Sequence, residues 1–250
     1  MVTDYQSYTY PTDHLRDRII LITGASDGIG QALALHAASL GAQIILHGRD
    51  VPKLEKVYDE IEAMEAAPRP SIAVMDLATA DSNAYRSLAD RLEEEFGRLD
   101  GLVLNASIIG DRFSIEQYDA AQWQQVMHVN LTSAFVLTQV CLPMLQESDS
   151  GSIIYTSSGV GRTGRAHWGA YAASKFATEG LSQVLADEQR HTNLKVNCIN
   201  PGATRTKMRL AAFPGEDRDA LKRPEEILGA YIYLLGSDSE GVTGQSLDAQ

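Results

Sequence analysis

Short unbroken runs of aliphatic residues alternate with longer amphipathic stretches along most of the chain, and this alternation restricts the possible folds more than any other feature. The first run, residues 19–22, stops at a glycine-rich turn, and residues 31–40 then follow a helical pattern that ends at Gly41, the expected left-handed cap. Runs without polar residues indicate strands covered on both faces. Repeated strand–helix–strand units therefore predict an α/β fold with a doubly wound, mostly parallel sheet and helices on both faces.

The predicted sheet has seven strands, at residues 19–22, 43–47, 71–75, 102–105, 152–156, 195–200 and 246–249. The predicted helices have apolar residues three and four positions apart, and they span residues 31–40, 52–66, 82–96, 120–145, 171–190 and 224–235. In a chain of 250 residues this pattern favours a single Rossmann-type domain over residues 18–250. Residues 1–17 are polar and aromatic without periodicity, and we expect them to form an arm on the domain surface.

The charge and cysteine content exclude several classes of protein. With 21 basic and 33 acidic residues the net charge is −12, so the overall field disfavours nucleic acids and anionic membranes as partners. Cys141 and Cys198 lack the short spacing of a disulfide framework or zinc cluster, and the histidines lack metal-ligand spacing. The N-terminus has no signal-peptide pattern, and the most apolar segment, residues 134–145, is short for a membrane span. We expect a cytoplasmic protein with reduced thiols and without a metal site.

The turn after the first predicted strand has the spacing T-G-x-x-x-G-x-G, from Thr23 to Gly30. Glycines at these places let the backbone turn sharply and approach a phosphate closely. The start of the following helix supplies unpaired N–H groups and the positive end of a dipole. The spacing differs from the G-x-G-x-x-G fingerprint, but its position directly after the first strand favours a phosphate-binding turn over a plain turn.

Tyr171 and Lys175 are four positions apart, which places a phenol and an ammonium on one face of a predicted helix. A nearby ammonium stabilises the phenolate, and we expect it to lower the tyrosine pKa from about 10 toward neutral pH. Alone, this spacing is common and typical of a solvated helix face. However, Ser157 and Ser158 end a predicted strand at the carboxyl edge of the sheet, where open α/β folds bind ligands, and this context favours acid–base catalysis.

With both motifs present, the chain resembles the short-chain dehydrogenase/reductase family from about residue 17 to residue 248. Within that family, residues 18–30 and 168–180 are similar to the YciK-type bacterial oxidoreductases. The resemblance implies hydride transfer between a nicotinamide cofactor and a small carbonyl or alcohol substrate. The implied catalytic residues are Asn130, Ser158, Tyr171 and Lys175. Ser158 is preferred to Ser157 because it stands thirteen places before Tyr171, as the catalytic serine does in the family.

The resemblance also implies a role for each of these residues. Tyr171 would give or take the proton, Lys175 would lower its pKa and bind the nicotinamide ribose, and Ser158 would bind the substrate oxygen. Asn130 would hold a water that links Lys175 to solvent. The implied cofactor-binding residues are Thr23, Gly24, Ser26, Asp27, Gly28, Ile29, Gly30, Arg49, Asp76, Leu77, Asn105, Ala106, Tyr171, Lys175, Pro201, Gly202, Thr204 and Thr206.

In the family, loops cover the substrate, and here the loop of residues 203–222 is the expected counterpart. Apolar residues on this loop and on the loop after the fourth strand are expected to line the substrate site. They are Ile108, Ile109, Phe113, Met208, Leu210 and Phe213. Ser107 replaces the glycine of the family's N-A-G motif, so the backbone there is expected to differ slightly. The family also implies a homo-oligomer, a dimer or tetramer, paired through the long helices at residues 120–145 and 171–190.

The residues after the second predicted strand favour NADP(H) over NAD(H). Gly48 occupies the place of the acid that selects NAD, and Arg49 can pair with the 2′-phosphate of NADP. Asp50 is expected to cap the next helix. Against NADP, Asp27 stands where many NADP-dependent relatives have a second basic residue. An NAD-dependent dehydrogenase and a non-catalytic dinucleotide-binding sensor or scaffold remain alternatives, although a sensor has no need of the proton-handling groups.

Overall fold

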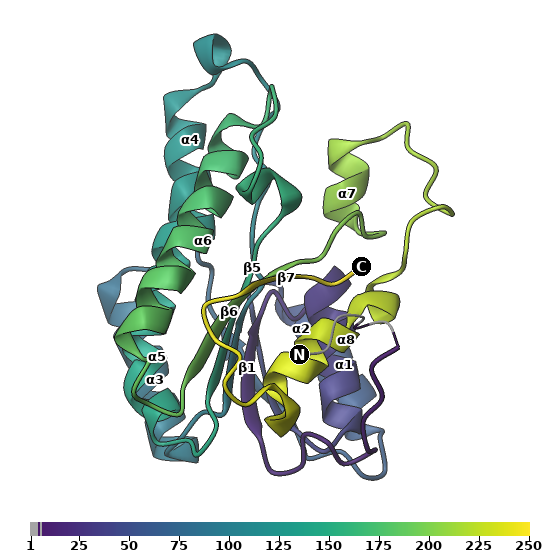
Figure 1. Cartoon of the computed structure of the whole chain (residues 1–250), viewed down its shortest axis with the longest axis vertical. Coiled ribbons are helices and arrows are strands. Elements are labelled where there is room, and N and C mark those ends of the chain that lie inside the picture. Colours follow the sequence, from purple (N-terminus) through teal and green to yellow (C-terminus); the bar gives the residue numbers. More distant parts are fainter. Residues whose placement is uncertain (1–4, 6) are drawn as a thin grey trace.

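The computed structural model describes residue 5 and residues 7–250, and it confirms the doubly wound α/β sheet (Figure 1). All its strands run parallel, in the order β3-β2-β1-β4-β5-β6-β7. Their bounds are β1 (Ile19–Thr23), β2 (Gln43–Gly48), β3 (Ser71–Val74), β4 (Gly101–Leu104), β5 (Ser152–Thr156), β6 (Lys195–Asn200) and β7 (Ser246–Asp248). The strand order reverses between β1 and β4. The segments that follow these two neighbouring strands therefore turn to opposite sides, which leaves a crevice at the carboxyl ends of the strands.

Helices form a layer on each face of the sheet (Figure 1). One layer contains α1 (Gly28–Ser39), α2 (Val51–Glu62) and α8 (Gly229–Leu235). The other contains α3 (Ser82–Phe96), α4 (Ala120–Met127), α5 (Ser133–Gln146) and α6 (Gly169–Glu188). The short helix α7 (Lys207–Ala212) stands apart from both layers, above the carboxyl ends of the strands. Single 3₁₀ turns occur at Ile115–Gln117, Gly159–Gly161, Pro224–Ile227 and Ser237–Ser239.

Alternate residues of the strands β1 to β6 enter two separate hydrophobic cores. Ile22 of β1 belongs to the core beneath α1 and α8, whereas its neighbour Leu21 faces the core beneath α3 and α5. Leu21 pairs in register with Ile45 of β2 and Leu102 of β4, which enter the same core. Burying each such side chain contributes roughly 1.5–3 kcal/mol, so the two cores fix the register of the strands that carry the site.

The helix predicted at residues 120–145 is interrupted, and the expectation of one regular helix is wrong. A π-helical turn at His128–Thr132 separates α4 from α5. Such a turn contains an extra residue and rotates the side chains that follow it, and π turns often mark functional sites. The sequence prediction also missed α7. Its six residues are too few to show a helical period, and it is capped by Thr206, whose hydroxyl accepts a hydrogen bond from the Arg209 N–H at 3.1 Å.

The helical stretch Ala120–Gln146 has 27 residues and a mean hydropathy of 1.3 over its most apolar window. By length and composition it would suffice for a membrane span, so the estimate from residues 134–145 considered too short a segment. Core helices of globular proteins pass the same test. Here Leu137, Cys141 and Leu145 are fully buried in the core beneath α3 and α5, as in a core helix.

The described part of residues 1–17 lies against α1 and α8. Leu15 is fully buried and its N–H donates to the Leu40 carbonyl at the end of α1 at 3.0 Å. Tyr8 stacks edge-on against Tyr233 of α8, and its hydroxyl donates to Asp238 at 2.7 Å. This described segment packs on the layer formed by α1 and α8 and contributes no residue to the cavity described next.

Candidate active site

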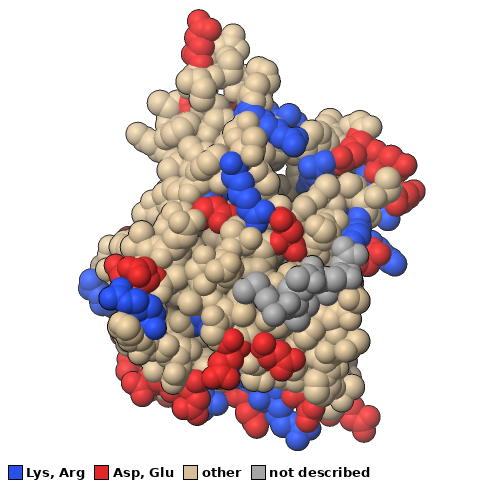
Figure 2. All heavy atoms as spheres, viewed as in Figure 1, with Lys and Arg blue, Asp and Glu red and all other residues tan. Residues whose placement is uncertain are grey.

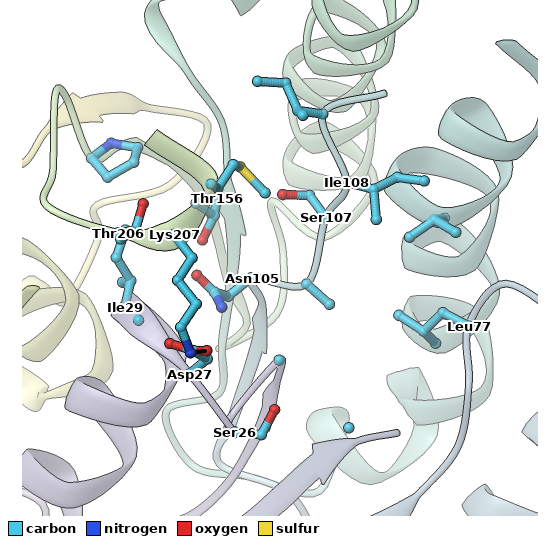
Figure 3. Close-up of a pocket in the computed structure, with 18 of the residues that line it drawn as sticks. Ser26, Asp27, Ile29, Leu77, Asn105, Ser107, Ile108, Thr156, Thr206 and Lys207 are labelled. Carbon is cyan, nitrogen blue, oxygen red and sulfur yellow. Dashed lines mark hydrogen bonds and ion pairs between the residues drawn. The ribbon is translucent and has the colours of Figure 1, made fainter. Parts of the chain in front are cut away.

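A cavity of about 560 Å³ opens at the carboxyl ends of the strands, where the strand order reverses (Figure 3). The predicted cofactor residues that line it are Gly24, Ser26, Asp27, Gly28, Ile29, Arg49, Asp76, Leu77, Asn105, Ala106, Tyr171, Pro201, Gly202, Thr204 and Thr206. Of the predicted catalytic residues, Ser158 and Tyr171 line it. Thr23, Gly30, Asn130 and Lys175 are absent from the lining, and all of them contact residues that belong to it.

The glycine turn leads into α1 in a geometry that needs glycine. Gly24 and Gly28 have φ of +67° and +56°, in the left-handed region that glycine adopts without strain. A Cβ at Gly30 would lie 2.3 Å from the Gly24 carbonyl oxygen, so no other residue fits there. Asp27 precedes α1 but makes no side-chain cap to it within the described chain, and the first N–H groups of the helix are left for an anionic ligand.

Thr23 holds this turn against the end of β4. Its hydroxyl donates to the Val103 carbonyl at 3.2 Å and accepts from the N–H groups of Asn105 and Ala106 at 2.9 and 3.0 Å. The Asn105 amide donates back to the Thr23 carbonyl at 3.1 Å. Thr23 is 1 % exposed, so its side chain positions the two lining segments and does not itself face the cavity.

Charged residues surround the ends of β2 and β3. The Arg49 guanidinium lies 3.4 Å from the Asp76 carboxylate and remains largely exposed. Asp50 caps α2 as predicted, accepting from the Lys53 N–H at 3.3 Å, and its carboxylate lies 2.7 Å from the Lys53 ammonium. Lys53 lines the cavity and was missed from the sequence, although its place one turn after Arg49 was a usable signal.

His47 at the end of β2 also lines the cavity, although the sequence predicted no role for it once a metal site was excluded. The ring is 1 % exposed, and burial lowers its pKa to about 4, so it is neutral at physiological pH. In the part of the chain that the structure describes, neither ring nitrogen has a hydrogen-bond partner, and the same holds for the buried Ser157 hydroxyl. Buried polar groups without partners at a cavity wall are expected where a polar ligand completes them.

Tyr171 and Lys175, on successive turns of α6, are both buried. The Lys175 ammonium lies 5.5 Å from the centre of the Tyr171 ring and donates to the Thr156 carbonyl at 2.7 Å. Burial raises the pKa of Tyr171 to about 12, and a hydrogen bond with the Ser158 side chain opposes this rise. Burial lowers the pKa of Lys175 to about 8.

These pKa directions correct the expectation that the pKa of Tyr171 is lowered toward neutral pH. In this structure desolvation of the phenol outweighs any attraction to the ammonium, which is directed at the Thr156 carbonyl. The phenol of Tyr171 is therefore neutral at physiological pH. With a pKa of about 8, the Lys175 side chain is mostly protonated at neutral pH and loses its proton in mildly alkaline solution.

Asn130 lies in the π turn at His128–Thr132 and is 4 % exposed. Its Oδ1 accepts from the Ile108 N–H at 2.8 Å, and its Nδ2 donates to the Ile108 carbonyl at 2.9 Å and to the Ser174 hydroxyl at 3.1 Å. The amide therefore clamps the lining segment after β4 to α6. The polar atoms of its side chain are thus engaged within the protein, and the water-holding role expected for Asn130 stays a prediction.

Helix α7 closes the other side of the cavity with apolar residues. Ile108, Ile109 and Met208 line it as expected, but Phe113 and Leu210 are 50 % and 37 % exposed and do not. The predicted lining residue Phe213 instead packs in a cluster with Trp168 and Tyr171, on which α7 rests. The guanidinium of Arg112 lies 4.6 Å and 4.8 Å from the ring centres of Trp168 and Phe213, and it donates to the Ala212 carbonyl.

The cavity is less acidic than the chain as a whole. Its charged lining residues are four cations and three acids, namely Arg49, Lys53, Lys207, Arg209, Asp27, Asp50 and Asp76. In Figure 2, Lys and Arg side chains gather beside the hollow between α6 and α7, while Asp and Glu side chains lie at the outer end of the α7 region and, mixed with basic ones, along the opposite edge. Within residues 5 and 7–250, no group of three or more metal-ligating side chains occurs.

A crevice at the reversal point of a parallel sheet, faced by a glycine turn and the start of α1, defines a dinucleotide-binding protein of the Rossmann class. The model of the short chain dehydrogenase family matches residues 18–217. The chain belongs to the short-chain dehydrogenase/reductase family and is an oxidoreductase acting on alcohol or carbonyl groups. The glycine cradle and the unpartnered groups of His47 and Ser157 fit the nicotinamide dinucleotide of that family.

Individual relatives support the family assignment along nearly the whole chain. The uncharacterised oxidoreductase YciK of Escherichia coli (strain K12) is 50% identical over 243 residues, which are 97% of this chain and 96% of the relative. A solved structure of the E. coli oxidoreductase yciK has a TM-score of 0.95 at 50% identity and covers 98% and 99% of the two chains. A short chain dehydrogenase from E. coli CFT073, solved in complex with NADPH, has a TM-score of 0.94 at 51% identity and covers 96% and 100%. The resemblance to YciK-type oxidoreductases is thereby confirmed.

The clamp made by Asn130 predicts a structural cost for its removal. Asn130→Ala leaves the Ile108 N–H and carbonyl without their partner, and we expect a loss of roughly 1–3 kcal/mol in the free energy of unfolding. Urea unfolding of the purified protein measures this change. Asn193→Ala, which alters an exposed asparagine, is the matched control and should unfold like the parent. An unchanged unfolding free energy in Asn130→Ala would show that the clamp contributes nothing.

Proposed function

We propose that the protein is an NADP(H)-preferring oxidoreductase that interconverts a carbonyl and an alcohol on a small or medium-sized organic substrate. The observation that carries the cofactor preference is the end of β2. There Gly48 stands in place of an acid, and Arg49 and Lys53 present two cations to the cavity, paired with Asp76 and Asp50. A 2′-phosphate benefits from both, whereas a ribose hydroxyl needs neither. The NADPH complex of a 51% identical relative supports the same preference.

The remaining lining residues fit the other parts of the dinucleotide. Gly24, Gly28 and the start of α1 would hold the pyrophosphate, and Asp76 and Leu77 would contact the adenine. Pro201, Gly202 and Thr206 would hold the nicotinamide end. When bound, the cofactor supplies the hydride acceptor or donor, and the protein's own residues orient the substrate and handle the proton.

Tyr171 handles that proton. In reduction its phenol donates to the substrate oxygen, and in oxidation its phenolate accepts the alcohol proton. Ser158 donates a hydrogen bond to the same oxygen and stabilises the charge that develops there. The Lys175 ammonium, 5.5 Å from the Tyr171 ring, stabilises the phenolate that forms when the proton leaves. Trp168, Met208 and Ile109 supply an apolar wall for the rest of the substrate.

We further propose that the protein acts in the cytoplasm as a homo-oligomer, a dimer or tetramer, and binds neither nucleic acid nor membranes. The two buried free cysteines support the cytoplasmic location. The net charge of −12 supports the proposal that the protein binds neither nucleic acid nor membranes. Apolar side chains exposed on α5 and α6 support the oligomer, because Phe135, Phe176 and Val184 are 46 %, 45 % and 57 % exposed. An NAD-dependent dehydrogenase and a non-catalytic dinucleotide sensor are the competing functions.

Parallel titrations with NADPH and NADH, followed by nicotinamide fluorescence, test the cofactor preference. We expect tighter binding of NADPH, and in Arg49→Ala a loss of roughly 10- to 100-fold for NADPH because a charged hydrogen bond is removed. Binding of NADH should change less than about twofold, since its ribose carries no phosphate. Arg86→Ala, an exposed arginine of α3, is the control. Preference for NADH would favour the NAD-dependent alternative, and binding of neither nucleotide would overturn both dehydrogenase functions.

Tyr171→Phe tests the proton-handling role. We expect turnover of carbonyl substrates with NADPH to fall by roughly 10²- to 10⁴-fold, while NADPH affinity stays nearly unchanged, because only the hydroxyl is removed. Because the unliganded phenol has a pKa of about 12, alcohol oxidation by the parent should accelerate as pH rises through the neutral range. A Tyr171→Phe variant that keeps most of its activity would exclude this residue as the acid.

Phe176→Glu tests the proposed oligomer. A carboxylate on the exposed apolar face of α5 and α6 would have to be desolvated on association, so we expect the variant to be a monomer at micromolar concentration. Multi-angle light scattering measures the mass directly. The control, Glu188→Gln at the end of α6, should keep the parent's mass. A parent protein that is already monomeric would refute the oligomer.

A further inference from the structure

An ion pair joins helix α7 to the glycine turn across the mouth of the cavity. The Lys207 ammonium lies 2.5 Å from the Asp27 carboxylate, and the two residues are 180 positions apart in the chain. Figure 3 shows the Lys207 side chain running from the start of α7 down to Asp27. Thr206, the neighbour of Lys207, packs against Gly28 of the glycine turn, since a Cβ placed on Gly28 would lie 3.3 Å from the Thr206 methyl group. The pair is therefore part of a contact that seats α7 on the phosphate-binding turn.

Asp27 belongs electrostatically to the same cluster as the cations at the start of α2. Attraction to Asp27 contributes to a raised pKa of Lys53, whose direct partner is Asp50. A phosphate held by Arg49 and Lys53 would consequently be placed close to the Asp27 carboxylate and would be repelled by it. The repulsion matters for a ligand that carries a phosphate at this end of the cavity, and hardly at all for one that carries a hydroxyl there.

Other roles of Asp27 do not account for its position. It precedes α1, but within the described chain its side chain makes no capping hydrogen bond to that helix. The side chains of Asp27 and Lys207 are 42 % and 75 % exposed, and ion pairs this exposed contribute little to stability. The pair lines the cavity, and its effect is the removal of one negative charge from the cavity wall.

We propose that Lys207 determines cofactor specificity by neutralising Asp27, so that the 2′-phosphate of NADP(H) can bind to Arg49 and Lys53. This inference rests on the proposed NADP(H) function and assigns one of its determinants to α7, a helix that closes the substrate side of the cavity. The cation that favours the phosphate thus comes from a different part of the chain than the acid that opposes it.

A double-mutant cycle with Lys207→Ala, Asp27→Asn and the combined variant tests the proposal. The dissociation constants for NADPH and NADH are measured by nicotinamide fluorescence at low ionic strength, where screening is weak. We expect Lys207→Ala to weaken NADPH binding on the order of tenfold, because an uncompensated carboxylate then faces the phosphate. NADH binding should change by less than about twofold, since it lacks that phosphate.

Asp27→Asn in the Lys207→Ala background should restore NADPH binding to within about twofold of the parent, because the repelling charge is gone. Lys56→Ala, which removes an exposed lysine paired with Glu60 on α2, is the control for a general loss of positive charge and should bind as the parent does. Thermal unfolding of each variant confirms that it is folded.

The possible outcomes separate this inference from the function on which it rests. If the parent binds NADPH but Lys207→Ala leaves the ratio of NADPH to NADH affinity unchanged, the specificity role of Lys207 is overturned and the proposed function stands. An equal loss for both nucleotides, or no recovery in the combined variant, also overturns it. If the parent binds neither nucleotide, the proposed function fails, and the inference fails with it.

Discussion

The tie between the carboxyl ends of β1 and β4 is the interaction on which the rest of the site depends. Thr23 donates to one β4 carbonyl and accepts from the two N–H groups that follow, at the place where the strand order reverses. The helices that follow β1 and β4 lie on opposite faces of the sheet, and Thr23 links the ends of the two strands beside the crevice that this reversal opens. One buried hydroxyl thereby fixes the distance between the glycine turn and the wall formed by Asn105 and Ala106.

Burial governs the chemistry of the site more strongly than pairwise charge does. Tyr171, Lys175 and His47 are all kept nearer their neutral forms by desolvation. By contrast, the cations at the rim of the cavity remain exposed and are each paired with a carboxylate, as Arg49 is with Asp76. The site thus has a buried end that holds the groups proposed to handle the proton and an exposed end where charge is balanced. These two ends match the reacting and the recognised parts of a dinucleotide.

The sequence was sufficient for features that depend on neighbouring residues and insufficient for those that depend on distant ones. The helix predicted at residues 82–96 from its apolar spacing is confirmed to the residue, and its ends are local, since Asp81 caps its start and Gly97, with φ of +70°, ends it. The π turn was missed because the spacing of apolar residues shows only the mean helical period of the whole segment. The hydrogen bonds between Asn130 and Ile108 were missed because these residues are 22 positions apart. Likewise, the motif spacing placed Tyr171 and Lys175 together, but their pKa directions depend on burial, which a local pattern does not show. The ion pair between Asp27 and Lys207 joins residues 180 positions apart, and no local sequence pattern indicates that they meet.

The clamp formed by Arg112 has a kinetic consequence. Its guanidinium is held between Trp168 and Phe213 and bonds to the end of α7, so it ties this helix to the start of α6 beside the cavity. Any movement of α7 away from the cavity would separate this stack, so the contact would oppose opening of the loop and couple that opening to the exchange of ligands.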